Sequence, residues 1–225
     1  MQARLSPEGY LGLRLTGGAI ALIGASWLFG GVAEDVISGD PLTIVDRVIA
    51  RWLYAHATPP LTQFMLVVTH AHGVVAISTY ALLVALYLAW KRDGFWLLCL
   101  AAALPGGMIL NALTKLAFRR ERPSFEHPLL DLSTFSFPSG HVAGATLLYG
   151  VLAAMLAGKV HAWGWRVLIV STALSLVALV ALTRMYLGVH YLSDTIAAFA
   201  EAFAWLMLCL VGIHAYWSRR AQARA

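Results

Sequence analysis

The sequence predicts an all-helical membrane protein, a bundle of six transmembrane helices. Of its 225 residues, 60% are hydrophobic and only 12% are charged, a balance that soluble domains of this size rarely show. Long apolar runs recur along the chain, and about 20 apolar residues suffice to cross a bilayer as a helix. These two observations assign residues 1–225 to a single integral membrane domain.

The predicted spans follow the apolar runs in order. The first run is longer than the core of a secretory signal peptide, so we expect it to remain as a span. The charged, mixed stretch after it predicts a short interfacial helix, closed by a turn at Thr58-Pro59-Pro60. Residues 61–90 are too long for one upright crossing, so 61–71 are expected to extend the second span outward. The six spans are expected at residues 15–33, 73–90, 95–114, 141–158, 165–183 and 195–217.

Basic residues near the span ends set the expected orientation, because Lys and Arg favour the cytoplasmic side. With the N-terminus inside, nine basic residues fall in the cytoplasm: Arg4, Arg14, Lys91, Arg92, Lys159, Arg166, Arg219, Arg220 and Arg224. Seven fall outside: Arg47, Arg51, Lys115, Arg119, Arg120, Arg122 and Arg184. The bias grows when Lys115, Arg122 and Arg184 are set aside as site residues. We therefore expect a multi-pass protein of the inner (plasma) membrane with both termini in the cytoplasm.

Nearly all of the polar chemistry gathers in three short stretches at the outer ends of the spans. Cations, histidines and carboxylates are costly near a membrane unless they pair or serve a function. Their clustering indicates an enzyme with an anionic substrate, a phosphate above all. The stretches are Lys115…Arg122-Pro123, Pro138-Ser139-Gly140-His141 and Arg184…His190…Asp194.

The first stretch places Lys115 and Arg122 seven residues apart, after the third span. Arg offers a planar fork of donors that matches phosphate oxygens, and Lys supplies a compact charge. A basic loop at the lipid headgroups is the alternative for this pair, and it is our interpretation of Arg119 and Arg120.

The second stretch immediately precedes the fourth span. Ser139 is a natural helix N-cap, and a helix start presents free N–H groups and positive dipole charge to an anion. Gly140 lets that backbone approach closely, and His141 in the first turn is placed to donate a proton. By itself the stretch is better explained as an ordinary capped helix with an interfacial histidine.

In the third stretch His190 and Asp194 are four residues apart, so they face each other on a helical turn. A carboxylate bonded to one ring nitrogen fixes the tautomer and leaves the other nitrogen free to attack, as an activated nucleophile requires. Metal ligation by this pair is the competing interpretation. The nearby cations would repel a divalent ion, so we predict no metal site.

Together the three stretches resemble the tripartite signature of the type 2 phosphatidic acid phosphatase superfamily, the lipid phosphate phosphatases. That signature has Lys and Arg-Pro separated by six residues, then Pro-Ser-Gly-His, then Ser-Arg, five residues, His, three residues and Asp. Every position from Lys115 to Asp194 matches except Thr183, where Ser is usual, and Thr keeps the hydroxyl. The six-span core of the family also agrees with the hydropathy pattern.

The resemblance implies a metal-independent phosphatase that needs no cofactor and forms a phosphohistidine intermediate. It implies that His190 attacks phosphorus, that Asp194 orients His190 and that His141 protonates the leaving group. It also implies a set of phosphoryl-binding residues: Lys115, Arg122, Ser139, Gly140 and Arg184. Among membrane lipid substrates it favours undecaprenyl diphosphate, with phosphatidylglycerol phosphate, lipid A and phosphoryl transfer to another acceptor as alternatives.

The remaining polar residues carry less information. Glu201 lies seven residues after Asp194, on the same face but deeper in the membrane. It is expected either to be neutral and hydrogen-bonded within the bundle or to tune the site. Four further histidines on the outer side are interpreted as satisfied or solvent-facing: His56, His70, His72 and His127.

Other classes of protein explain the sequence less well. An intramembrane serine protease would use Ser139 but gives no role to Lys115 and Arg122. An anion transporter would thread polar residues through several spans, whose apolar runs hold little besides Glu201. Nucleic-acid binding is excluded because no basic run is interleaved with stacking aromatics, although the formal net charge is +5. The oligomeric state is left open.

Overall fold

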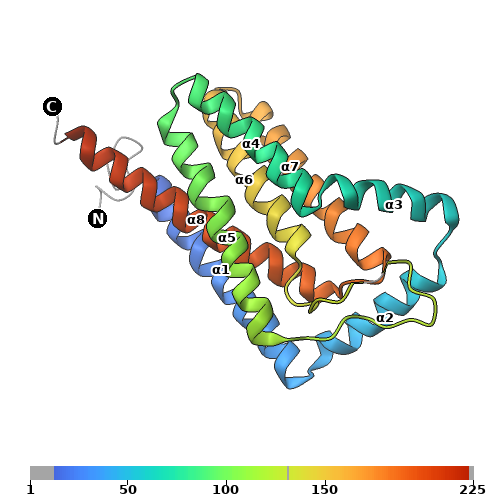
Figure 1. The fold of residues 1–225 in the computed structure, drawn as a ribbon. Helices are drawn as coiled ribbons and strands as arrows, with labels where there is room; N and C mark the ends of the chain where they lie inside the picture. The colour runs from blue at the N-terminus through green and yellow to red at the C-terminus, as the bar shows by residue number, and fades with distance from the viewer. Residues whose placement is uncertain (1–12, 131, 223–225) are drawn as a thin grey trace.

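The computed structural model describes residues 13–130 and 132–222, and within them it contains eight helices and no strand (Figure 1). Five helices are long and apolar enough to cross a membrane, and a sixth crossing is added if the bent pair α3 and α4 is counted as one span. The predicted class of all-helical membrane bundle is therefore confirmed. The helices are α1 (Leu13–Ser38), α2 (Pro41–Ala55), α3 (Pro59–Ala71), α4 (Val74–Trp90), α5 (Gly94–Phe118), α6 (Gly140–Lys159), α7 (Trp163–Tyr186) and α8 (Leu192–Gln222).

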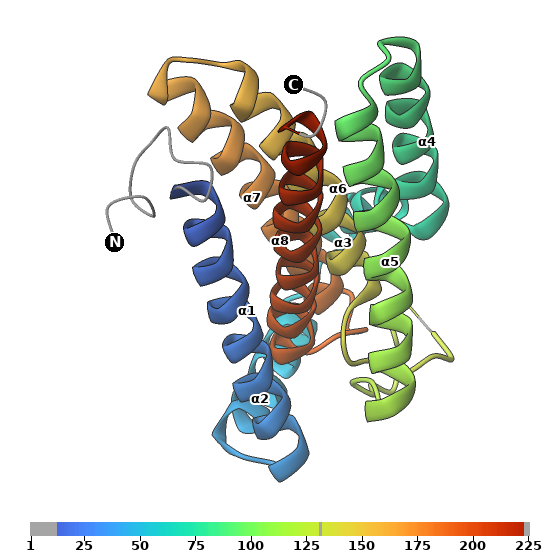
Figure 2. The same cartoon turned by 90° about the vertical axis from the view of Figure 1, so that its left-hand side faces the viewer.

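Helices α6 and α8 form the centre of the bundle, with α1 and α5 on either side of α8 (Figure 2). Small residues let these helices approach closely, as is common in membrane interiors. At Gly107 of α5, a Cβ atom would lie 2.6 Å from Leu147 of α6 and 3.0 Å from Trp205 of α8. The Gly106-Gly107 pair therefore allows α5 to pack tightly against both central helices.

Helix α2 separates polar and apolar side chains on two faces, as expected for a helix at the membrane surface. Its residues Ile44, Val48 and Trp52 are exposed, whereas Thr43 and Asp46 are buried against the bundle. In Figure 1 it runs across the end of the bundle, beneath the start of α8. The predicted interfacial helix thus carries a buried carboxylate inward.

The second crossing is broken. Residues 59–71 form a separate helix, α3, which is bent by 47° from α4. Gly73 adopts an extended backbone conformation as the N-cap of α4, so it interrupts the helix just after His72. The outward extension predicted for residues 61–71 therefore turns away from the line of the span.

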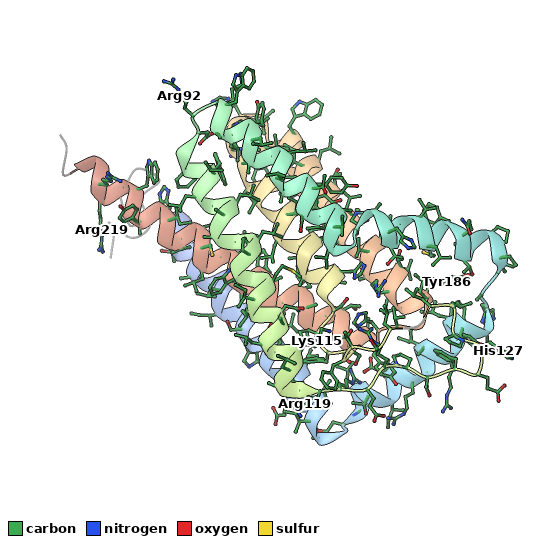
Figure 3. All side chains as sticks on the ribbon, in the orientation of Figure 1. Arg92, Lys115, Arg119, His127, Tyr186 and Arg219 are labelled. Carbon is green, nitrogen blue, oxygen red and sulfur yellow. The ribbon has the colours of Figure 1, made fainter. Side chains whose placement is uncertain are left out.

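The two ends of the bundle carry different connections. Lys115 and Arg119 lie at the end where α2, α3 and the α5–α6 loop gather, whereas Arg92 and Arg219 lie at the opposite end (Figure 3). All three polar stretches belong to the first of these ends, which we call the site end of the bundle.

Candidate active site

The chain folds so that four helix ends and one connector bring the polar stretches together. Lys115 lies in the last turn of α5, and Arg184 in the last turn of α7. His141 and Asp194 lie in the first turns of α6 and α8. His190 lies in the short connector between α7 and α8. A bundle of alternating direction thus gathers residues that are far apart in the sequence.

His190 and Asp194 form a buried pair. The distance from Nδ1 of His190 to Oδ2 of Asp194 is 3.3 Å, and the backbone N–H of Tyr191 donates to the same oxygen at 2.9 Å. His190 is 2% exposed and Asp194 is fully buried. A carboxylate only accepts hydrogen bonds, so Nδ1 carries the proton of the ring.

Arg122 approaches the other side of the same ring. Its Nη1 atom lies 3.3 Å from Nε2 of His190. A guanidinium has donors and no acceptor, so Nε2 is the acceptor and presents a lone pair. Burial lowers the pKa of His190 to about 4, although its hydrogen bond with Asp194 acts in the opposite direction. The ring is therefore neutral near pH 7.

Lys115 holds the loop that leads into α6. Its Nζ atom donates to the carbonyl oxygens of Phe135 and Pro138, both at 2.8 Å, and to that of Ser136 at 3.4 Å. These bonds occupy the three donors of the ammonium group. Its charge also lies within electrostatic range of Arg122 and Arg184.

Two hydrogen-bonding groups of the site lack partners. Ser139 is the N-cap of α6, but its hydroxyl makes no capping hydrogen bond, contrary to the role expected from sequence. Among the described residues, Oγ of Ser139 and Nε of Arg184 are the two buried side-chain polar atoms without a hydrogen bond. The Nη1 atom of Arg184 donates to Thr69. Such unmatched groups are rare in native interiors and call for a ligand or ordered water.

His141 lies beside the break between α3 and α4. It is within electrostatic range of Arg184 and His190, and its Nε2 atom would lie 3.8 Å from a Cβ atom at Gly73. A cavity of about 40 Å³ adjoins it, lined in part by His72. His72 itself is satisfied by a hydrogen bond to the hydroxyl of Tyr149 at 2.8 Å. The helix break therefore opens space next to His141.

Glu201 belongs to a buried polar cluster behind the site. Its carboxylate accepts hydrogen bonds from Asn111, at 3.0 Å, and from Thr114. Asn111 in turn reaches Gly140, because its Oδ1 atom would lie 3.5 Å from a Cβ atom there. The cluster supports the N-terminus of α6, and sequence reasoning did not single out Asn111.

Arg120 corrects one interpretation from the sequence. It was assigned with Arg119 to a basic loop at the headgroups, yet its Nη1 atom donates to Oδ1 of Asp194 at 2.6 Å. Its Nη2 atom donates to Oδ2 of Asp46 at 2.8 Å. Burial alone would lower the pKa of Arg120, but the two carboxylates raise it. Arg119 is exposed, as expected. Arg120 and Asp46 were thus missed, since no sequence pattern links them.

Metal-ligating side chains do not cluster at the site. No group of three or more His, Cys, Asp or Glu side chains is arranged to hold a metal ion in residues 13–130 and 132–222. The cations Arg120, Arg122 and Arg184 surround the His190–Asp194 pair instead, an arrangement suited to an anion.

Comparisons with known proteins agree with the fold. The sequence profile of the PAP2 superfamily matches residues 94–218. Phosphatidylglycerophosphatase B of Bacillus subtilis is 26% identical over 175 residues, which cover 77% of this chain and 86% of that protein. The crystal structure of the PAP2-type phosphatidylglycerolphosphate phosphatase from Bacillus subtilis has a TM-score of 0.74 and 26% identity, over 84% of this chain and 93% of that one. Aquifex aeolicus LpxE shares the fold, with a TM-score of 0.60 and 19% identity over 74% of this chain and 94% of its own.

Proposed function

The chain belongs to the PAP2 superfamily, and from this premise we propose that it hydrolyses the phosphate monoester of a membrane glycerolipid. The observation that carries the proposal is the pair of unmatched buried groups, Oγ of Ser139 and Nε of Arg184. Both can donate to an oxygen, and phosphoryl oxygens only accept. Arg184 lies within electrostatic range of the neutral ring of His190. The backbone N–H of Ser139 donates to the carbonyl oxygen of Asp194 at 3.1 Å.

The proposed substrate is phosphatidylglycerol phosphate. The sequence alone ranked undecaprenyl diphosphate first and kept the glycerolipid as an alternative. The relatives favour that alternative, because the similar Bacillus subtilis protein is a phosphatidylglycerophosphatase and the similar crystal structure is of a phosphatidylglycerolphosphate phosphatase. Each covers most of this chain.

In the proposed first step, Nε2 of His190 attacks phosphorus in line with the leaving oxygen of the lipid. The N–P bond forms as the P–O bond breaks, and His141 gives its proton to the departing alcohol oxygen. Asp194 keeps the proton on Nδ1 and stabilises the positive charge that the ring acquires. This requires His141 to be protonated on binding, which the negative charge of the incoming phosphate favours.

In the proposed second step, water attacks the phosphohistidine. His141, now neutral, takes the proton of that water, the N–P bond breaks and inorganic phosphate leaves. Through both steps Arg122, Arg184, Ser139 and the free N–H groups at the start of α6 stabilise the charge on the phosphoryl oxygens. The protein therefore contributes positioning and electrostatic stabilisation, which are what phosphoryl transfer requires.

The location of the site at a bundle end suits a lipid substrate. A lipid can keep its tails in the bilayer while its phosphate enters the polar end of the bundle. We place this end outside the cytoplasm, because the opposite end carries basic residues in and beside the short α4–α5 and α6–α7 loops. Those residues are Lys91, Arg92, Lys159 and Arg166.

Cysteine labelling tests this orientation. Glu126 and His161 are exposed at the site end and in the α6–α7 loop, respectively. A membrane-impermeant maleimide is expected to label Glu126→Cys in intact cells and His161→Cys only after permeabilisation. The parent protein measures background from Cys99 and Cys209, both within helices. The reverse pattern would place the site in the cytoplasm.

Phosphate release tests the activity. Purified protein in detergent with excess chelator is given phosphatidylglycerol phosphate, phosphatidic acid, undecaprenyl diphosphate and lipid A in parallel, with His190→Ala as control. We expect chelator-resistant release, fastest from phosphatidylglycerol phosphate and reduced to background by the substitution. Release that persists in His190→Ala contradicts the mechanism, and preference for undecaprenyl diphosphate contradicts the substrate. Transfer of the phosphoryl group to an added alcohol would assign a transferase.

A further inference from the structure

Arg120 joins two buried carboxylates that lie far apart in the sequence. One arm of its guanidinium bonds Asp194 at 2.6 Å and the other bonds Asp46 at 2.8 Å. Both carboxylates are fully buried, and the Arg120 side chain is 15% exposed. Breaking a buried ion pair leaves an uncompensated charge, which is strongly unfavourable. The two pairs therefore hold the carboxylates of Asp46 and Asp194 in fixed orientations.

Asp46 also accepts hydrogen bonds from the first turn of α8. Its Oδ1 atom accepts from the backbone N–H of Ser193 at 2.9 Å, and its Oδ2 atom accepts from the hydroxyl of Ser193. That hydroxyl accepts in turn from Arg120 at 2.6 Å. A carboxylate at a helix N-terminus is stabilised by free N–H groups and the helix dipole. Asp46 of α2 therefore fixes the first turn of α8, where Asp194 lies.

Tyr191 completes the arrangement. The guanidinium carbon of Arg120 lies 4.4 Å from the centre of its ring, within the range of a cation–π contact. The backbone N–H of Tyr191 donates to Oδ2 of Asp194. Every residue from Tyr191 to Asp194 except Leu192 is thus held by Arg120 or Asp46, directly after the proposed nucleophile His190.

We propose that Arg120 and Asp46 form a positioning clamp. The clamp sets the orientation of Asp194 and, through Asp194, the orientation and tautomer of the His190 ring. The inference rests on the proposed phosphatase function. Arg120 holds Oδ1 of Asp194 and so leaves Oδ2 to His190. Without Arg120 the buried carboxylate would turn toward other cations, and His190 would lose the partner that keeps its proton on Nδ1.

The clamp also links the nucleophile to the membrane surface. Asp46 lies on the inner face of α2, whose outer face exposes Ile44, Val48 and Trp52. One helix therefore carries both the apolar side chains that face outward and the carboxylate that holds the start of α8. A positioning role therefore explains why a surface helix carries a fully buried carboxylate.

The test compares charge-removing variants with matched controls. Arg120→Gln and Asp46→Asn remove one charge of the clamp each, and Arg120→Lys keeps the charge but loses the two-armed contact. Arg119→Gln and Glu34→Gln remove the same charges from exposed neighbouring positions. The readouts are kcat and KM with phosphatidylglycerol phosphate, the thermal midpoint, and the ring ¹⁵N shifts of His190, which report its tautomer without turnover.

We expect the clamp variants to lower kcat about 10- to 100-fold, with KM changed less than about threefold, as misplacement of a reacting group does. The Nδ1-protonated tautomer of His190 is expected to lose population in Arg120→Gln and Asp46→Asn, with partial recovery in Arg120→Lys. The double variant should cost little more than either single change, because both act through Asp194. The controls should match the parent protein.

Two results would overturn the clamp. One is an unchanged kcat and tautomer in folded Asp46→Asn or Arg120→Lys. The other is a lowered thermal midpoint with normal kcat, which would assign these residues to stability alone. If Arg120→Gln does not fold, the two milder variants decide the question. A parent protein inactive on every lipid contradicts the proposed function instead, and the tautomer measurement still tests the clamp.

Discussion

The Nη1 atom of Arg122 lies 3.3 Å from Nε2 of His190. The cation proposed to hold a phosphoryl oxygen therefore already touches the atom proposed to attack phosphorus. Arg122 is fixed there by the carbonyl oxygens of Val189, Thr134 and Phe135. Such preorganisation lets an arriving phosphate exchange places with the ring nitrogen without moving the guanidinium.

Arg122→Lys should test that geometry. Lysine keeps the charge but cannot bond the loop carbonyls and a phosphoryl oxygen together. We expect kcat/KM with phosphatidylglycerol phosphate to fall about 100-fold, the usual effect of losing one preorganised donor. Arg119→Lys, an exposed neighbour, serves as the control. If Arg122→Lys stays near parental activity, charge alone suffices and the fork geometry is irrelevant.

His190 should titrate at low pH. Burial lowers its pKa from 6.5 to about 4, so the folded ring stays neutral while the ring in unfolded chains takes up a proton. The stability contributed by the neutral ring is thus complete above pH 6.5 and is lost as the pH falls through about 4. Ring resonances of His190, assigned by their loss in His190→Gln, measure this. A midpoint near 6.5, the ordinary value, would show that the folded ring is not desolvated.

Ser139→Ala should separate function from stability. The hydroxyl of Ser139 is buried and unpartnered, so its removal leaves no other group unsatisfied and should not lower the thermal midpoint. A phosphoryl oxygen would lose a donor, and kcat/KM should fall about 10- to 100-fold. Ser171→Ala, on an exposed face of α7, controls for the loss of a hydroxyl. A lower midpoint with normal kinetics would assign Ser139 to helix capping.

The sequence predicts the bundle well, and it predicts that the motif residues gather at one end of it, for physical reasons. A membrane helix satisfies its own backbone, so apolar length alone identifies it. The motif residues at helix ends then share one side of the bilayer because successive spans alternate in direction. Even so, the helices run past the apolar runs. Helix α1, for example, ends at Ser38 rather than near residue 33, because α-helical hydrogen bonding continues into the polar interface.

Contacts across the chain are what the sequence does not reveal. Asp46 and Arg120 are 74 residues apart, and the only sign of Asp46 is its place on an amphipathic helix. The bend between α3 and α4 at Gly73 brings that glycine close to His141, a proximity that no local pattern reports. Lys115 was expected at the phosphoryl group, yet its ammonium binds loop carbonyls. Its contact with substrate stays a prediction.

Glu201 should act through packing rather than catalysis. Glu201→Gln keeps an acceptor for Asn111 and a polar partner for Thr114, so we expect activity within about threefold of the parent. Glu201→Leu leaves both partners unpaired in the bundle, at a cost of about 1–3 kcal/mol. Thermal unfolding and phosphate release measure the two effects. Inactivity of a stable Glu201→Gln would show that the carboxylate tunes the site.

Gly107→Ala should destabilise the bundle, although alanine ordinarily favours helices over glycine. The added Cβ atom would lie 2.6 Å from Leu147 and 3.0 Å from Trp205, and Leu147 is fully buried, so these side chains would have to shift within a packed interface. Overpacking of this kind costs about 1–3 kcal/mol. Gly24→Ala in α1 is the matched control, because nothing lies within 4 Å of its added Cβ. In thermal unfolding in detergent, we therefore expect a lower midpoint for Gly107→Ala and an unchanged midpoint for Gly24→Ala. Equal midpoints would mean that the neighbouring side chains move aside at no cost, and the close packing at Gly107 would then not limit the stability of the bundle.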